Sequence, residues 1–279
     1  MSSPLPTYYR AEFKSTWKTD NVGVSNDNQI VLPLEISGTY NFKVSWGDEN
    51  TDKITIYNQS EVTHTYASAG IYTVKIIGTI NGWRFNNVGD KLKLLTIESW
   101  GELLLGNNAC NFYGCSNLII NAVDILDVSS NTTFYAIFRN CSSLTTFDVS
   151  SWDVSSITTF RDAFYGCSSL TTLDVSSWDV GSVTAMNSVF YGCVLLTDVV
   201  VNNWNITSTT NMTHMFFGVT LTTDRYDSIL IAWAALAVQP NVNFNAGNSK
   251  YTGGGAAATA RAVLTSAPNN WIITDGGIA

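Results

Sequence analysis

One fixed spacing organises the middle of this 279-residue chain. Several kinds of side chain recur at this spacing and keep a single phase over about five turns. The recurring columns are Phe112, Phe138, Phe164, Phe190 and Phe216; Leu118, Leu144, Leu170 and Leu196; Ile97, Val123, Val149, Val175 and Val201; Trp100, Trp152, Trp178 and Trp204, with Leu126 in the missing place; and Cys115, Cys141, Cys167 and Cys193. Agreement among so many columns makes an internal repeat the first constraint on the fold.

The period, about 26 residues, lies within the range of about 20–29 residues that is typical of leucine-rich repeats. Within one unit, Leu170, Leu173 and Val175 have strand-like spacing, whereas Phe160, Phe164 and Cys167 are spaced by four and three positions, as on a helix. We therefore expect residues 86–222 to form a parallel solenoid with a short strand and a short helix or 3₁₀ turn in each turn. Stacking would bury the apolar columns of each turn against the next turn.

The segments on either side of the repeat have different patterns. Residues 20–85 contain short alternating stretches that predict a small antiparallel β-sandwich. The expected strands are Gln29–Ile36, Tyr40–Trp46, Lys53–Tyr57, Val62–Tyr66 and Ile71–Ile77. Residues 223–279 predict helix, strand, helix and strand at Arg225–Val238, Asn241–Ala246, Ala256–Leu264 and Trp271–Thr274. We interpret this last segment as α/β capping turns, residues 1–19 as an N-terminal arm, and the whole chain as mostly β.

The cysteine column has two interpretations. Neighbouring parallel strands lie about 4.8 Å apart, which is within the Cα separation of about 4.4–6.8 Å that a disulfide allows. Reduced cysteines, however, pack as small hydrophobic residues, and the next turn has Val219 in the same place. We favour a buried column of free thiols. A linear column does not converge on a metal ion as four zinc ligands do, so no metal site is expected.

Two further columns leave alternatives open. The tryptophans Trp152, Trp178 and Trp204 are either a packed ladder in the core or a face that stacks against a glycan. The acidic column, at Asp127, Asp153, Asp179 and Asn205, either binds calcium or accepts hydrogen bonds from nearby backbone N–H groups in turns. We favour core packing for the tryptophans and turn formation for the acidic column.

Catalytic patterns are missing from the sequence. The two histidines, His64 and His214, lie about 150 positions apart in different segments, and nothing in the sequence pairs either one with a serine and a carboxylate. The common zinc-protease, phosphate-loop and hydrolase motifs do not occur. We expect no enzyme activity, no catalytic residues and no cofactor.

Charge narrows the classes of partner. The formal net charge is −8, and only 13% of the residues are charged. Nucleic-acid binding needs a basic stripe to neutralise phosphates, and between Lys93 and Lys250 the only basic residues are three arginines. No stretch of about 18 apolar residues predicts a transmembrane helix, and the first residues lack the apolar core of a secretory signal. We expect neither nucleic-acid binding nor membrane insertion.

Two families resemble parts of this sequence. V-S-W-G-D-E-N from Val44, followed by T-H-T-Y-A-S-A-G-I-Y-T-V-K-I from Thr63, is similar to the PKD-type Ig-like domain, although Glu49 replaces a usual glycine. This resemblance implies a structural role for His64. The repeat unit, from Leu170 to Cys193, resembles the BspA-like leucine-rich-repeat surface proteins, as does the leader Phe13–Ile30. The resemblance implies a surface or adhesive role without shared catalytic residues.

These observations lead to a functional expectation. We expect a non-enzymatic structural or adhesive protein of a phage or virus particle, such as a capsid decoration, fibre or tail protein, located on the virion surface. The alternatives are a bacterial cell-surface adhesin and a glycan-binding module. The apolar arm, with Tyr8, Tyr9 and Phe13, is the candidate docking segment for other virion or surface proteins. A host-surface glycan or protein is a further candidate partner, with the tryptophan column as the ligand face.

Overall fold

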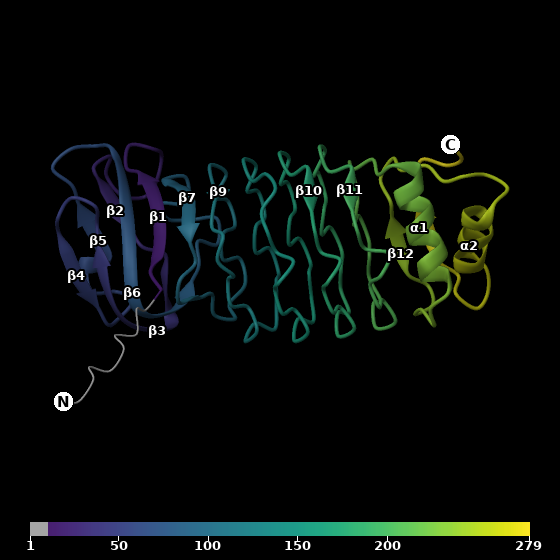
Figure 1. Ribbon diagram of the computed structural model, residues 1–279, viewed down its shortest axis with the longest axis horizontal. Helices are drawn as coiled ribbons and strands as arrows, with labels where there is room; N and C mark the ends of the chain where they lie inside the picture. The colour runs from purple at the N-terminus through teal and green to yellow at the C-terminus, as the bar shows by residue number, and fades with distance from the viewer. Residues whose placement is uncertain (1–10) are drawn as a thin grey trace, which may run out of the picture.

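The protein, described here by a computed structural model covering residues 11–279, is elongated and mostly β. An antiparallel sheet forms one end, a stack of coils forms the middle, and two helices lie at the other end (Figure 1). Residues 11–279 contain β1 (Phe13–Lys18), β2 (Gln29–Val31), β3 (Leu34–Ser45), β4 (Thr51–Ile54), a 3₁₀ turn (Ser60–Val62), β5 (Thr63–Thr65), β6 (Ile71–Trp83), β7 (Leu94–Ser99), β8 (Leu103–Leu104), β9 (Ile119–Ile120), β10 (Thr172–Leu173), β11 (Asp198–Val199), α1 (Thr223–Ala234), β12 (Asn243–Asn245), α2 (Ala256–Thr265) and β13 (Ile272–Thr274).

The largest sheet joins the N-terminal part of the chain to the coils. Its strand order is β4-β3-β6-β1-β7-β9, and β8 pairs with β6. The pairs β3–β6, β1–β6 and β1–β7 are antiparallel, whereas β7–β9 is parallel and begins the stacking of the coils. β2 and β5 form a separate antiparallel pair. The two regions therefore share one sheet and one continuous hydrophobic core.

The described part of the arm predicted at residues 1–19, from residue 11 onward, belongs to the main fold; residues 1–10 lie outside the described residues. Phe13–Lys18 is β1, a central strand of the large sheet, and its side chains alternate so that Phe13, Ser15 and Trp17 are buried. The ring of Phe13 lies 5.1 Å from that of Trp83, with an edge-to-face geometry. This alternation in F-K-S-T-W-K is the ordinary signature of a half-buried strand. The predicted boundary at residue 85 is also crossed by the shared sheet and core.

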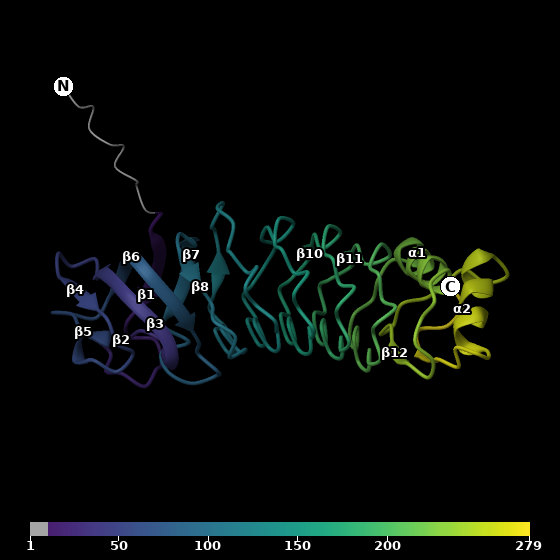
Figure 2. The same ribbon diagram turned by 90° about the horizontal axis from the view of Figure 1, so that it is seen from below.

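Backbone hydrogen bonds connect the coils at a fixed offset. The N–H groups of Phe160, Asp162, Phe164 and Gly166 donate to the carbonyls of Ala185, Asn187, Val189 and Tyr191, respectively, so each bond reaches the next coil along the chain. The same pattern recurs from the coil before and into the coil after. We call residues 94–222, which follow this pattern, the coil stack; Figure 2 shows its flattened coils side by side.

The return path of each coil is not the helix or 3₁₀ turn that the sequence predicts. Asp162 and Gly166 both have left-handed backbone angles, with φ of 55° and 71°. The N–H groups of Ala163, Tyr165 and Cys167 donate to carbonyls three residues earlier and form separate turns, while the N–H groups between them pair with the next coil, so no continuous helix forms. A glycine at a turn end favours the left-handed conformation, which explains the glycine at position 166. The other left-handed column is occupied by Cys110, Ala136, Asp162, Ser188 and His214.

The predicted apolar columns are buried, with one exception. Every residue of the phenylalanine and leucine columns is at most 1% exposed, and successive phenylalanine rings stack with centroids 5.3–5.8 Å apart. Val123, by contrast, is 98% exposed. Ile97 in β7 pairs with Ile120 in β9, so Ile120 takes the inward position that the repeat assigns to Val123.

The C-terminal segment follows the predicted order of elements. The hydroxyl of Thr222 caps α1 by accepting from the N–H of Arg225, and α1 buries Tyr226, Ile229, Leu230 and Trp233. β12 and β13 pair in parallel, and Met212 bridges to Phe244. The hydrogen-bond ladder of the coils thus continues into the last two strands. Residues 223–279 close the core at this end (Figures 1 and 2).

Two neighbouring leucines test the packing register. Leu196 is fully buried and Leu195 is 53% exposed. We expect Leu196→Ala to lower the free energy of unfolding by about 2–5 kcal/mol, as other buried leucine truncations do. Leu195→Ala is the matched control and should change it by at most about 0.5 kcal/mol. Urea unfolding measures both values, and equal effects would show that the register is wrong.

Candidate functional site

The tryptophan column lies in the core and not on a ligand-binding face. Trp152, Trp178 and Trp204 are 4%, 4% and 1% exposed, and their rings stack with centroids 6.4 Å apart. The indole N–H groups of Trp178 and Trp204 donate to the carbonyls of Val149 and Val175, at 2.9 and 3.0 Å. Core packing, the interpretation favoured from the sequence, is therefore confirmed, and the alternative of a ligand face at these three residues is wrong.

The candidate docking residues divide into two groups. Tyr8 and Tyr9 lie outside the described residues. Phe13 is fully buried in β1, so it has no surface to offer a partner. The prediction that Phe13 belongs to a docking arm is therefore corrected.

The cysteine column is a ladder of buried free thiols, as favoured from the sequence. Cys141, Cys167 and Cys193 each donate through Sγ to a carbonyl oxygen of the preceding coil, at 3.1 Å. Burial raises the pKa of the Cys193 thiol to about 12 and raises the pKa values of Cys115, Cys141 and Cys167 well above the ordinary value. These thiols stay protonated at neutral pH and are poor nucleophiles and metal ligands.

The acidic column forms turns. Oδ1 of Asp127, Asp153 and Asp179 accepts from the backbone N–H two positions later, at 3.0–3.1 Å, and Asn205 does the same at 3.3 Å. This is the Asx-turn arrangement that the sequence favoured over calcium binding. Among residues 11–279, no three histidine, cysteine or carboxylate side chains are grouped to hold a metal ion.

His64 has a structural environment in the N-terminal region. Its ring stacks on Trp46 with centroids 4.7 Å apart, packs edge-to-face against Tyr66 at 4.5 Å, and hydrogen-bonds through Nε2 to Asp48 at 2.8 Å. The Tyr66 hydroxyl donates to the carbonyl of Trp46. These residues form one cluster, and it explains why the sequence motifs around Trp46 and His64 occur together.

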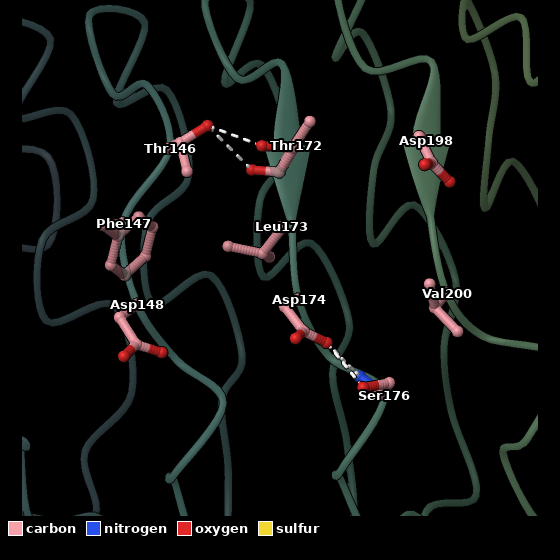
Figure 3. A pocket seen from close by; sticks show the side chains of 9 residues that line it. All are labelled: Thr146, Phe147, Asp148, Thr172, Leu173, Asp174, Ser176, Asp198 and Val200. Atoms are coloured by element: carbon pink, nitrogen blue, oxygen red, sulfur yellow. Dashed lines mark hydrogen bonds between the residues drawn. The ribbon is translucent and has the colours of Figure 1, made fainter.

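A hollow of the coil stack lies over β10 and β11 (Figure 3). It is open, has a volume of about 520 Å³, and takes residues from three neighbouring coils. Thr146 and Thr172 line one edge with their hydroxyl oxygens 2.7 Å apart, and the apolar side chains of Phe147 and Leu173 form the floor. The remaining lining residues are Asp148, Asp174, Ser176, Asp198 and Val200. We call these nine residues the β10–β11 groove.

The β10–β11 groove is acidic and its carboxylates are engaged. Asp148 and Asp174 each accept from the hydroxyl and N–H of the serine two positions later, which lowers the pKa of both carboxyls below the ordinary value. Asp198 accepts from Nε of Arg225 at 2.8 Å. No histidine, cysteine or lysine lines this groove. Its chemistry is that of a surface of hydrogen-bond acceptors over an apolar floor, without a nucleophile–base pair.

A second column on the coil stack was missed by the sequence reasoning. The residue after each buried phenylalanine forms a partly exposed stack. Its members are Tyr113, Arg139, Tyr165, Tyr191 and Phe217. The Arg139 guanidinium lies 4.4 Å from the ring of Tyr165, and Tyr165, Tyr191 and Phe217 stack at 4.4 and 4.7 Å. The sequence contained a signal for this column, because an aromatic residue recurs at the repeat spacing in every position except Arg139.

Comparison with known proteins gives one match. Residues 107–228, less than half of the chain, match a protein family described as "Mycoplasma protein of unknown function, DUF285". The match lies within the repeat region and α1, and it agrees with the resemblance of the repeats to BspA-like surface proteins. No curated protein and no solved structure matches the chain. Among residues 11–279, neither helix has the length and hydrophobicity needed to cross a membrane.

Asp124 gives the molecule a testable dependence on pH. Its carboxylate accepts from the N–H groups of Trp100 and Gly101 and from the Ser99 hydroxyl, at 2.8–3.0 Å. Partial burial by itself would raise the pKa of Asp124, but these hydrogen bonds lower it below the ordinary value. A carboxyl with a lowered folded-state pKa stabilises the fold above its unfolded-state pKa and loses that contribution as the pH falls.

We therefore expect Asp124→Asn to destabilise the protein at pH 7 by about 1 kcal/mol, a value reduced by solvent screening. The difference from wild type should shrink as the pH falls below about 4, the ordinary pKa at which the carboxyl of the unfolded chain is protonated, and should disappear once the folded-state carboxyl is protonated as well. Asp179→Asn is the control, because Asn205 already occupies the same place in the next coil. Unfolding measured from about pH 7 to about pH 2.5 tests this, and a constant difference would contradict it.

Proposed function

We propose that this chain is a non-enzymatic structural or adhesive protein displayed on a biological surface. One observation carries the proposal: the repeated side chains that could react or bind a ligand are instead used for core packing and for turns. The tryptophans are buried, the thiols are protonated and buried, and the aspartates of the repeat close their own turns. The repeat therefore builds a long, stiff body whose hydroxyl-rich and acidic exterior is available for contacts.

We further propose a PKD-type Ig-like N-terminal region followed by a leucine-rich-repeat-like solenoid with an α/β cap. The cluster of Trp46, Asp48, His64 and Tyr66 supports the first assignment, because these are the residues that carry the family motif. The constant offset of the hydrogen bonds between coils supports the second.

A phage or virus particle is the first setting that we propose, with the protein on the virion surface. The low proportion of charged residues, the net charge of −8 and the modular plan support this setting. The scarcity of basic residues argues against nucleic acid as the partner. The partners proposed are other virion or surface proteins, contacted through residues 1–10, and a host-surface glycan or protein.

A bacterial cell surface is the second candidate setting. The observation that favours it is the match of residues 107–228 to a family of Mycoplasma proteins. In this setting the protein is an adhesin, and the same exterior of the coil stack makes the contacts. The two settings differ in where the native protein is found, so fractionation of the native source distinguishes them.

Removing residues 1–10 tests the docking proposal. The truncation leaves β1 intact, and Glu12 keeps its backbone contact with the Ser99 hydroxyl. We expect incorporation into particles to fall at least tenfold while the melting midpoint stays within about 2 °C, because no described strand is removed. Normal incorporation of the truncated protein would contradict docking through this segment. Absence of the wild-type protein from purified particles would contradict the virion setting itself.

A further inference from the structure

A small hollow lies where the coil stack meets the capping strands. It has a volume of about 140 Å³ and is open to solvent. Its lining comes from the last coil, from β12 and from β13: Thr213, His214, Asn243, Phe244, Asn245, Ile272 and Thr274. We call it the β12–β13 hollow. Figure 2 shows β12 beside the last coil, at the start of the C-terminal cap.

The backbone under the β12–β13 hollow is held rigidly. β12 and β13 pair in parallel, with Asn243 opposite Ile272 and Asn245 opposite Thr274. The N–H groups of Met212 and Phe216 donate to the carbonyls of Asn243 and Asn245, at 3.2 and 3.0 Å. Side chains on paired strands keep their relative positions better than side chains on loops. The backbone positions that carry the polar side chains of β12 and β13 are therefore fixed relative to one another.

Most of these polar groups are uncommitted within residues 11–279. The Asn243 amide, the hydroxyls of Thr213 and Thr274 and the His214 ring make no hydrogen bond to another described residue. Asn245 uses only Oδ1, which accepts from the N–H of Gly247 at 2.8 Å, and its amide nitrogen stays free to donate. Several donors and acceptors thus surround one small concave surface. Its apolar part is Ile272, 63% exposed, over the buried ring of Phe244.

The lining selects among classes of ligand. No lysine, arginine, aspartate or glutamate lines the β12–β13 hollow, so neither an anion nor a cation finds a full opposite charge there. A purely apolar ligand would cover several amide and hydroxyl groups without replacing their hydrogen bonds to water, which is costly. A neutral ligand rich in hydroxyl groups, with one apolar side, satisfies both the polar rim and Ile272.

We propose that the β12–β13 hollow binds one ring of a neutral saccharide. This inference rests on the proposed adhesive surface role and names a ligand class for it. The site is separate from the β10–β11 groove, whose lining includes three aspartates. It also uses the exposed ring of His214, which makes edge-to-face contacts with Tyr191 and Phe217.

Phe217 extends the site beyond His214. The Phe217 ring is 46% exposed, and one of its faces stacks on Tyr191 at 4.7 Å. The ring of His214, which lines the hollow, meets the Phe217 ring edge-to-face at 5.8 Å. Aromatic rings stack favourably on apolar surfaces, including the C–H face of a pyranose. A second sugar ring of an oligosaccharide accordingly packs on Phe217.

The test uses the full chain and a defined set of probes. Saturation-transfer NMR is recorded with the methyl glycosides of glucose, galactose, mannose and N-acetylglucosamine, after a glycan array has been screened with the same protein. We expect at least one neutral glycoside to bind weakly. Asn243→Ala and Thr274→Val should weaken that binding at least tenfold, and Phe217→Ala should weaken a disaccharide more than a monosaccharide. Thr172→Val, at an exposed strand position of the β10–β11 groove, is the matched control and should bind normally.

Three results would overturn the proposal: no neutral glycan bound on the array or in solution, binding restricted to charged glycans or peptides, and sugar binding unchanged by Asn243→Ala and Thr274→Val. Each variant replaces an exposed side chain, and an unchanged melting midpoint confirms that it folds. Localisation of the native protein is measured independently. Failure of sugar binding with normal surface localisation rejects this site alone, whereas absence from any particle or cell surface rejects the proposed function.

Discussion

The register between coils is the constraint on which the rest of this structure depends. The N–H groups on the return path of one coil donate to carbonyls at a constant offset in the next, and the phenylalanine, tryptophan and cysteine columns are aligned by the same stacking. Each coil is too small to bury its own apolar residues, so its stability comes from its two neighbours. A shift of one position would place exposed residues such as Leu195 in the core and remove Leu196 from it.

An open stack must also be closed at both ends, because an unpaired coil exposes apolar surface and backbone polar groups. At the N-terminal end, the large sheet continues directly into the coils through β1, β7 and β9. At the other end, β12 and β13 extend the ladder and α1 covers the core with Trp233. The result is a single continuous body, and this suits a role in which surfaces are presented rather than moved.

The sequence predicted much of this arrangement because repetition makes burial visible. The periodic columns and the order of elements after residue 222 both follow from spacing and residue type. Val123 was wrongly predicted to be buried. The residue that pairs with Ile97 is Ile120, three positions before Val123, and a search for one constant period does not detect this shift. Phe13 was assigned to an arm although its alternation with Ser15 and Trp17 indicated a strand.

Other features could not be predicted because they depend on long-range contacts. Buried Lys93 donates through Nζ to the backbone of Ser25, Asn26 and Gln29, and buried Asp90 accepts from the N–H groups of Val24, Ser25 and Val31. Together they hold the loop before β2, which has no regular pattern of its own. The β12–β13 hollow likewise joins residues of the last coil to two strands that follow much later in the chain.

Deletion of one repeat tests the central claim most directly. Removing Ser168–Cys193 takes out one full period and joins Cys167 to Val194, so Leu196 replaces Leu170 in register. Removing Ser168–Gly192 retains Cys193, so every later residue is shifted by one position relative to the columns of the preceding coil. The measurement is cooperative thermal unfolding followed by circular dichroism. The account predicts a cooperative transition for the full-period deletion and its loss for the shorter deletion; the same behaviour in both would contradict it.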